Sequence, residues 1–162
     1  MAHATDIEIR LVRGREHPEL RRARLSALAH TRHLADHLAK ETAEPPSFWH
    51  DRAKKAASAK TMATFVAVEE DGFVGIIDGF LAEDGHTVEI GGMWVHAQRR
   101  RTGIGGELLS AILSWARERG ATQAGLWVRA SNEPARLLYE RCGFQLAETS
   151  GAGLRLAKKL WP

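Results

Sequence analysis

The chain has 162 residues, of which 44% are hydrophobic and 27% are charged, and its formal net charge is +3. At about 150 residues per domain, this length predicts a single domain over residues 1–162, and the composition argues against a disordered chain. The small net charge gives no indication of nucleic acid, and no apolar run approaches the ~18 residues of a membrane span. The N-terminal segment lacks the apolar core of a signal peptide. Because the single cysteine, Cys142, excludes an internal disulfide, we expect a cytoplasmic protein.

The chain begins with an expected strand followed by helices. Residues Asp6–Val12 alternate between apolar and polar side chains, which predicts a half-buried strand. Over about Pro18–Lys40, leucines recur at three- and four-residue steps, a helical spacing that is interrupted at Pro45–Pro46. A second helix is expected over Ser47–Lys60, with Ser47 as its N-cap.

Three expected strands form an antiparallel meander in the middle of the chain. Thr64–Glu70 and Phe73–Leu81 are predicted to pair through a turn at Asp71-Gly72, a dipeptide typical of tight hairpins. A second turn at Asp84-Gly85 leads into the third strand, Thr87–Val95.

The last part of the chain alternates between helices and strands. Two further helices are expected, one from the glycines at 103–106 to Gly120 and one from about Asn132 to Gly143. The remaining strands are Ala124–Val128, Phe144–Thr149 and Leu154–Leu160. The helix between Thr87–Val95 and Ala124–Val128 makes these two strands parallel neighbours. We therefore expect an α/β fold with a mixed, mostly antiparallel sheet of about seven strands and four helices.

A basic, glycine-rich turn separates Thr87–Val95 from the next helix. Three arginines, Arg99–Arg101, precede Gly103-Ile104-Gly105-Gly106. The first turn of a helix carries backbone N–H groups without partners and a partial positive charge, so this turn suits a phosphate or pyrophosphate. A Rossmann fingerprint is excluded because Leu108 stands where its third glycine would fall, and the Gly-Lys-Ser/Thr of a P-loop is absent. On these residues alone, a solvated basic turn is the alternative.

Two motifs resemble those of the GNAT family of N-acetyltransferases. Arg100-x-x-Gly103-x-Gly105 resembles the family's acyl-CoA pyrophosphate motif, and the segment from Asn132 to Phe144 resembles its second signature, Asn-x-x-Ala-x-x-x-Tyr ending in Gly-Phe. The resemblance implies a GNAT-like fold with splayed central parallel strands and transfer of an acetyl group from acetyl-CoA (coenzyme A) to a primary amine, by direct attack in a ternary complex. The implied partner is a small-molecule or protein amine, without nucleic acid, membrane or metal, and dimers common in the family allow a homodimer.

The resemblance also implies how the cofactor is held. Amides of the glycine-rich turn would bind the pyrophosphate, and the end of Thr87–Val95 would pair with the pantetheine arm and present an N–H to the acetyl carbonyl. Asn132 would hydrogen-bond the cofactor, although a plain N-cap is its alternative role. Ala97 stands where many members carry proline. The implied cofactor-binding residues are Met93, Trp94, Val95, Arg100, Arg101, Thr102, Gly103, Ile104, Gly105, Gly106 and Asn132.

Two residues are implied to carry the proton transfers. Tyr139, the only tyrosine, matches the family tyrosine that points at the CoA sulfur, and a phenol can protonate a departing thiolate; packing is its alternative role. Glu89 resembles the strand glutamate that serves as base in several members, acting directly or through water; a solvent-facing carboxylate is the alternative. His96 and Glu148 are weaker candidates for the base.

Other features leave alternatives open. His30, His33 and His37 share one helical face, but no fourth ligand accompanies them, so we expect a solvated or substrate-facing role and no metal. Cys142 is expected to pack and not to act as a nucleophile. Two other functions stay open: a catalytically inactive CoA-binding sensor, and a nucleic-acid-binding protein using Arg99–Arg101 with the arginines at 21, 22 and 24. No motif identifies the acceptor, which ranges from a small amine or amino acid to an aminoglycoside-like drug or a protein N-terminus.

Overall fold

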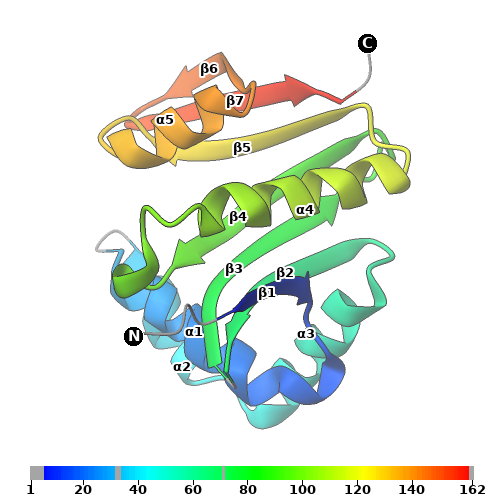
Figure 1. Ribbon diagram of the computed structural model, residues 1–162, viewed down its shortest axis with the longest axis vertical. Helices are drawn as coiled ribbons and strands as arrows, with labels where there is room; N and C mark the ends of the chain where they lie inside the picture. The colour runs from blue at the N-terminus through cyan, green and yellow to red at the C-terminus, as the bar shows by residue number, and fades with distance from the viewer. Residues whose placement is uncertain (1–5, 32–33, 71, 161–162) are drawn as a thin grey trace.

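The computed structural model describes residues 6–31, 34–70 and 72–160. These residues form one seven-stranded sheet in the order β1-β2-β3-β4-β5-β7-β6 (Figure 1). The strands are β1 (Ile7–Leu11), β2 (Met62–Glu69), β3 (Gly72–Leu81), β4 (Thr87–Val95), β5 (Gln123–Arg129), β6 (Gln145–Ser150) and β7 (Gly153–Lys159). Neighbouring strands are antiparallel except for the parallel pair β4 and β5. The expected mixed α/β sheet is therefore confirmed.

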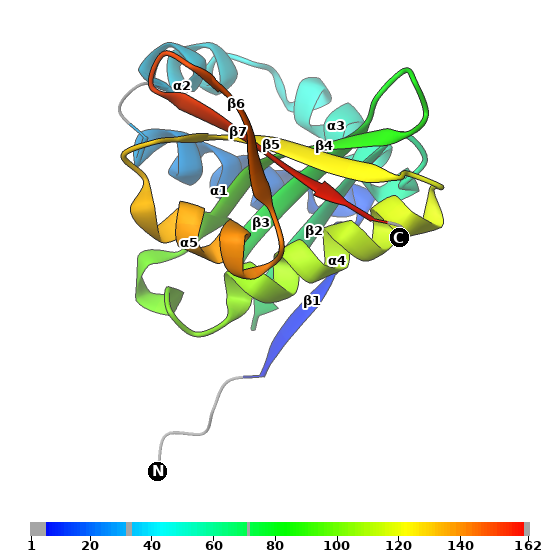
Figure 2. The ribbon, with the colours of Figure 1, turned by 90° about the horizontal axis from the view of Figure 1, so that it is seen from above.

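Helices cover both faces of the sheet. Within the described part of the chain the helices are α1 (His17–Ala29), α2 (Ala35–Thr42), α3 (Pro46–Ser58), α4 (Ile104–Glu118) and α5 (Glu133–Arg141), with 3-10 turns η1 (Gly14–Glu16) and η3 (Ala97–Arg99). Helices α1, α2 and α3 lie on one side of the sheet, and α4 and α5 lie on the other (Figure 2). Among the described residues, no helix has the length and apolar character needed to cross a membrane.

The first expected helix is two helices, so the fold has five α-helices among the described residues where four were expected. The hydrogen-bond ladder ends after Ala29, where the amide of Thr31 bonds to the Leu28 carbonyl over three residues. The Thr31 hydroxyl also donates to the Ala27 carbonyl (3.0 Å), so a side chain takes a backbone acceptor of the helix.

The start of α3 differs from the expected one, and part of the expected hairpin turn lies outside the described residues. Helix α3 begins at Pro46, with Pro45 and not Ser47 at the N-cap, because proline is well suited to the first helical position. Asp71 of the expected hairpin turn lies outside the described residues, and β3 begins at Gly72.

The parallel strands β4 and β5 separate halfway along their length. They pair only over Thr87–Ile90 and Gln123–Leu126, after which β4 follows β3 and β5 follows β7. At the separation, Gly92 and Met93 both lie opposite Ile77 of β3, which is a β-bulge. Gly92 has φ of +61°, and a Cβ there would lie 2.7 Å from Asp78 Oδ2, so only glycine fits.

The packing of α4 fixes the position of its first turn. Leu108 and Ile112 are fully buried, and Trp115 is 4% exposed. Gly79 of β3 allows this contact, because a Cβ there would lie 2.7 Å from Ile112 Cδ1. A second core, formed by Val12, Ala23, Ala56, Met62, Val66 and Ile76, lies under α1 and α3 on the other face. The glycine-rich turn before α4 is therefore attached to a rigid helix.

Candidate active site

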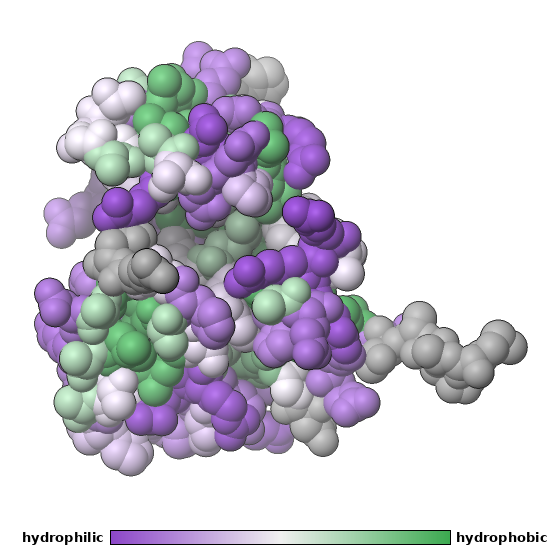
Figure 3. All heavy atoms as spheres, turned by 90° about the vertical axis from the view of Figure 1, so that its left-hand side faces the viewer, coloured by the Kyte–Doolittle hydropathy of each residue, from purple (hydrophilic) through white to green (hydrophobic). Residues whose placement is uncertain are grey.

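A cleft of about 1510 Å³ opens where β4 and β5 separate. Its walls come from α1, the end of β4, the glycine-rich turn, the first turn of α4, β5 and α5. Figure 3 shows this face of the molecule hollowed between the part that contains β5, β6, β7 and α5 and the part that contains α1 and α2. The cleft therefore lies where the sequence predicts the cofactor residues and Tyr139, but its lining does not include Glu89.

The backbone amides of the glycine-rich turn have no hydrogen-bond acceptor in the part of the chain that the structure describes. Gly103 is the N-cap of α4 and has a φ of +89°. Because glycine has no side chain, it cannot cap the amides of the first turn. Within the described residues, the amides of residues 101–106 donate no hydrogen bond to the protein. Arg101 also has a positive φ, +63°. A helix N-terminus whose amides have no partner among the described residues is suited to bind a pyrophosphate.

Side chains of the turn form hydrogen bonds and an ion pair that fix its conformation. The Arg100 Nε donates to the Val95 carbonyl at 3.2 Å, which ties the turn to the end of β4. Arg99 forms a two-point ion pair with Glu69 at 2.5 Å. The Thr102 hydroxyl donates to the Arg99 carbonyl, and Thr102 is the one predicted cofactor residue that does not line the cleft.

Gly105 faces the cleft from the first turn of α4. A Cβ there would lie 3.1 Å from Leu138 Cδ2 and 3.9 Å from Met93 Cε, so the space above it is limited by α5 and β4. Met93, Trp94 and Val95 line the cleft beside it on the part of β4 that has left β5. An extended ligand could therefore run along this edge of β4 from the turn.

Tyr139 lies on α5 and points into the depth of the cleft. Its side chain is 7% exposed, its hydroxyl lies 4.0 Å from the Met93 sulfur, and its ring packs edge-on against Phe144. Burial raises the pKa of Tyr139 to about 12. The phenol is therefore protonated at neutral pH and can act as a proton donor.

Asn132 lies at the start of α5 and lines the cleft. Its Oδ1 accepts a hydrogen bond from the Ala135 amide at 3.4 Å, so it is the N-cap of the helix. No described residue accepts a hydrogen bond from its Nδ2. The N-cap role and a contact with a ligand are therefore compatible.

Glu89 lies on β4 and is held by Arg155 of β7. Its two carboxylate oxygens accept hydrogen bonds from Arg155 at 2.8 and 2.5 Å, and this contact raises the pKa of Arg155. The guanidinium crosses β5 over Gly125, where a Cβ would collide with it. The Glu89 side chain is 40% exposed and is not among the residues that line the cleft.

The weaker candidates have other surroundings. The His96 Nδ1 accepts the Gln98 amide at 3.1 Å and so caps η3, and Glu148 is exposed on β6. Cys142 is half-buried at the C-cap of α5. Neither His96, Glu148 nor Cys142 lines the cleft.

The expected shared helical face of His30, His33 and His37 is wrong, because α1 ends at Ala29 and α2 begins at Ala35. His30 lines the cleft, with its Nδ1 2.7 Å from the Ser26 carbonyl, whereas His37 is exposed on α2. His33 lies outside the described residues. In the part of the chain that the structure describes, no group of three histidine, cysteine, aspartate or glutamate residues could hold a metal ion.

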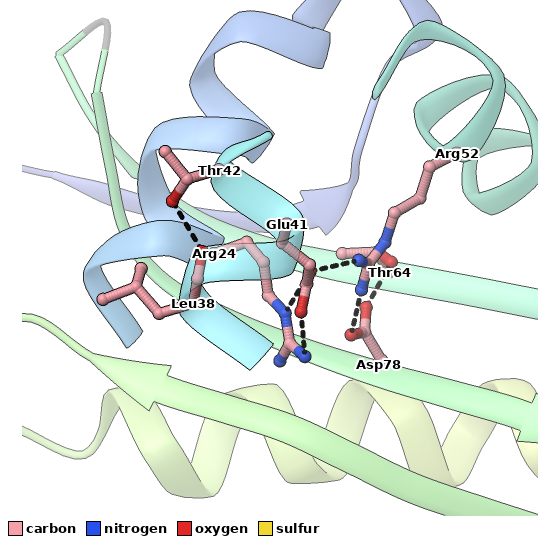
Figure 4. A network of polar contacts seen from close by, with 7 residues as sticks. All are labelled: Arg24, Leu38, Glu41, Thr42, Arg52, Thr64 and Asp78. Atoms are coloured by element: carbon pink, nitrogen blue, oxygen red, sulfur yellow. Dashed lines mark hydrogen bonds and ion pairs between the residues drawn. The ribbon is translucent and has the colours of Figure 1, made fainter. Parts of the chain in front are cut away.

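A polar network beneath the cleft was not anticipated from the sequence. Asp78 is 3% exposed, accepts a hydrogen bond from Thr64 at 2.5 Å and pairs with Arg52 at 3.2 Å. Arg52 also pairs with Glu41, which pairs in turn with Arg24 of α1 (Figure 4). Arg24 lines the cleft. No short motif links these residues, although the Gly91-Gly92 doublet within a strand is a signal for the bulge above them.

The mixed sheet, its separated parallel strands and the glycine-rich turn before α4 define the fold class of the chain. The model of the Acetyltransferase (GNAT) family matches residues 26–144, and the chain belongs to this family.

Solved structures share the fold over nearly the whole chain. The PaiA N-acetyltransferase of Thermoplasma acidophilum, solved with coenzyme A, has a TM-score of 0.80 and 16% identity, covering 95% of this chain and 99% of its own. The YncA protein of Salmonella typhimurium, solved with acetyl-CoA, has a TM-score of 0.75 and 17% identity, covering 95% and 94%.

Curated relatives match over shorter segments. A mycothiol acetyltransferase of Corynebacterium aurimucosum is 49% identical over 49 residues, which are 30% of this chain and 16% of the relative. An uncharacterised N-acetyltransferase of Methanocaldococcus jannaschii is 32% identical over 78 residues, which are 48% of this chain and 34% of the relative. The chain thus covers well under two thirds of the length of these relatives.

Proposed function

We propose that this protein is an acetyl-CoA-dependent N-acetyltransferase that acetylates a primary amine by direct attack in a ternary complex. The observation that carries this proposal is that the amides of residues 101–106 donate to no described residue, in a turn that borders a cleft between two separated parallel strands. Family membership supports acetyl transfer as the chemistry.

The residues of the cleft fit the cofactor. The amides of the turn would hold its pyrophosphate, with charge from Arg100 and Arg101. The missing side chain of Gly105 leaves room between α4 and α5, because a Cβ would already be 3.1 Å from Leu138. The pantetheine arm would lie along Met93–Val95, where β4 pairs with no described residue of β5. Asn132 would donate from its free Nδ2.

Two residues of the chain would carry out the two proton transfers of the reaction. When bound, acetyl-CoA supplies the acyl group as a thioester. Tyr139 holds a proton at its phenol oxygen in the depth of the cleft, where it can be given to the departing sulfur. A backbone N–H at the bulge of β4 would stabilise the negative charge that develops on the carbonyl oxygen.

Glu89 would accept the proton of the amine through water. A carboxylate offers about four lone-pair positions, and Arg155 occupies two of them. The ion pair also keeps Glu89 in place on β4. Because the carboxylate is 40% exposed, water can reach the remaining positions and bridge it to the cleft.

The two alternative functions are less well supported. Nucleic-acid binding would use the arginine clusters, but two of these arginines are engaged within the protein, Arg24 with Glu41 and Arg99 with Glu69, and the net charge is only +3. A CoA-binding sensor would not need a proton donor, yet the cleft contains the protonated phenol of Tyr139.

Calorimetric titration with acetyl-CoA tests the proposal. We expect binding in the micromolar range and thiol release when an amine is added. Gly105→Glu should abolish binding through steric conflict and charge repulsion, whereas Gly14→Glu, in η1 and outside the lining of the cleft, should bind as the native protein does. Binding without thiol release over a broad amine panel would favour the sensor, and no binding would refute both.

A further inference from the structure

We propose that the amine acceptor carries a carboxylate and that Arg24 binds it, so that amino acids are the substrate class. This inference rests on the proposed acetyl transfer and adds the chemistry of the acceptor. It comes from the position of Arg24, from the way its guanidinium is held and from the charges around the cleft.

Arg24 faces the point where β4 leaves β5. Its Nη1 lies 3.4 Å from the position that a Cβ on Gly92 would occupy, and Gly92 is the bulge residue of β4. Arg24 lies on α1, across the sheet from α4, whose first turn presents the free amides. The two sides of the cleft therefore offer separate cationic groups, one for the cofactor and one for another anion.

Two of the three guanidinium nitrogens of Arg24 bind Glu41, and the third, Nη1, binds no described residue. Nε and Nη2 each donate to Glu41 at 3.1 Å, and Glu41 is held in turn by Arg52 at 3.2 Å (Figure 4). No described residue accepts a hydrogen bond from Nη1. Because the ion pair with Glu41 fixes the guanidinium plane, Nη1 can bind a ligand oxygen at little further loss of side-chain entropy.

The nearby carboxylates are already neutralised. The side chain of Glu41 is 12% exposed and that of Asp78 is 4% exposed, and both bind Arg52. Asp78 also accepts a hydrogen bond from Thr64 at 2.5 Å. Neither carboxylate is available to attract a second positive charge of an acceptor.

The described lining of the cleft is strongly positive. Glu133 is the one acidic residue among the described lining residues. Six arginines line the cleft: Arg24 and Arg99, which are paired with Glu41 and Glu69, and Arg100, Arg101, Arg129 and Arg141, which form no ion pair with a described residue. Such a lining repels polycations, including aminoglycosides, and attracts an anion. In an amino acid the amine and the carboxylate share one carbon, so a carboxylate on Arg24 places the amine beside Gly92.

Matched acceptors test the inference. Each amino acid of a panel is compared with its C-terminal amide and with its decarboxylated amine, by thiol release from acetyl-CoA; an aminoglycoside is included. We expect the preferred amino acid to exceed its amide and its amine in kcat/KM by about ten- to a hundredfold, the effect of one charge-assisted contact. Equal or better turnover of the uncharged analogues or the aminoglycoside would overturn the inference.

Variants of α1 assign the effect to Arg24. Arg24→Gln should bring the ratio of kcat/KM for the amino acid to that for its decarboxylated amine close to one, mainly through KM of the amino acid, while Arg24→Lys should keep part of the preference. Arg22→Gln, an exposed position on the same helix, is the matched control. An equal loss for all acceptors in Arg24→Gln would overturn the assignment. Lack of acetyl-CoA binding in the native protein would instead refute the proposed function itself.

Discussion

The Glu89 carboxylate and the Arg155 guanidinium form a two-point ion pair that spans β5, with Nη1–Oε2 at 2.8 Å and Nη2–Oε1 at 2.5 Å. Gly125 lies beneath the guanidinium and has no side chain to obstruct it. The pair connects β4 and β7, and Glu89 and Arg155 are 66 positions apart in the sequence. It fixes the carboxylate proposed as the base and limits which of its lone pairs can take a proton.

Glu89→Gln tests that role. We expect kcat/KM at pH 7 to fall by about 10²-fold or more, as for the loss of a general base, and to recover in part at higher pH, where the amine loses its proton without help. The control is Glu83→Gln, at an exposed position outside the cleft. Unchanged activity across pH 6–9 would remove Glu89 from the mechanism and leave water as the base.

Replacement of Tyr139 should separate chemistry from binding. Tyr139→Phe keeps the ring and its contact with Phe144 but removes the proton donor, so we expect kcat to fall by about 10²-fold or more. Acetyl-CoA affinity, measured by calorimetry, should stay within about twofold, because the proposed phosphate contacts lie elsewhere. A kcat equal to that of the native protein would leave Tyr139 with a packing role alone.

The ionisation of Tyr139 can be followed directly, because it is the only tyrosine in the chain. In the folded protein its pKa is raised to about 12, against about 10 for an exposed phenol. The unfolded chain therefore loses this proton first, and the contribution to stability is present below pH ~10 and is lost as the pH rises towards 12. Near-ultraviolet absorbance should report the shifted ionisation, and Tyr139→Phe should lose less stability over that range. Ionisation near pH 10 in the folded protein would contradict the burial of the phenol.

The bulge of β4 can be tested by adding one methyl group. Gly92→Ala places a Cβ 2.7 Å from Asp78 Oδ2 at a φ of +61°, so we expect a loss of about 1–3 kcal/mol in the free energy of unfolding. Gly91→Ala is the control, because nothing lies within 4 Å of its Cβ position and its φ is not positive. Urea denaturation of both variants measures the difference, and equal stabilities would show that Asp78 can move away.

The strands and the turn could be predicted from local patterns, whereas the polar contacts could not. The alternation of apolar and polar residues in β1 and the glycines at 103–106 are patterns within a few neighbouring residues. The sequence alone therefore predicts the strand and the turn. The break after Ala29 escaped prediction because the leucine spacing continues across it. The contacts of Arg24 with Glu41 and of Glu89 with Arg155 join elements that are distant in the sequence. Composition and residue spacing do not predict such pairs.

Amide hydrogen exchange with and without acetyl-CoA tests the central claim most directly. The amides of residues 101–106 have no intramolecular acceptor among the described residues, so they should exchange rapidly in the free protein and become protected when acetyl-CoA is bound. Amides along Met93–Val95 should gain protection as well, and Gly105→Glu should show neither change. Saturating acetyl-CoA that leaves exchange across residues 101–106 unaltered would contradict the claim that these amides hold the cofactor.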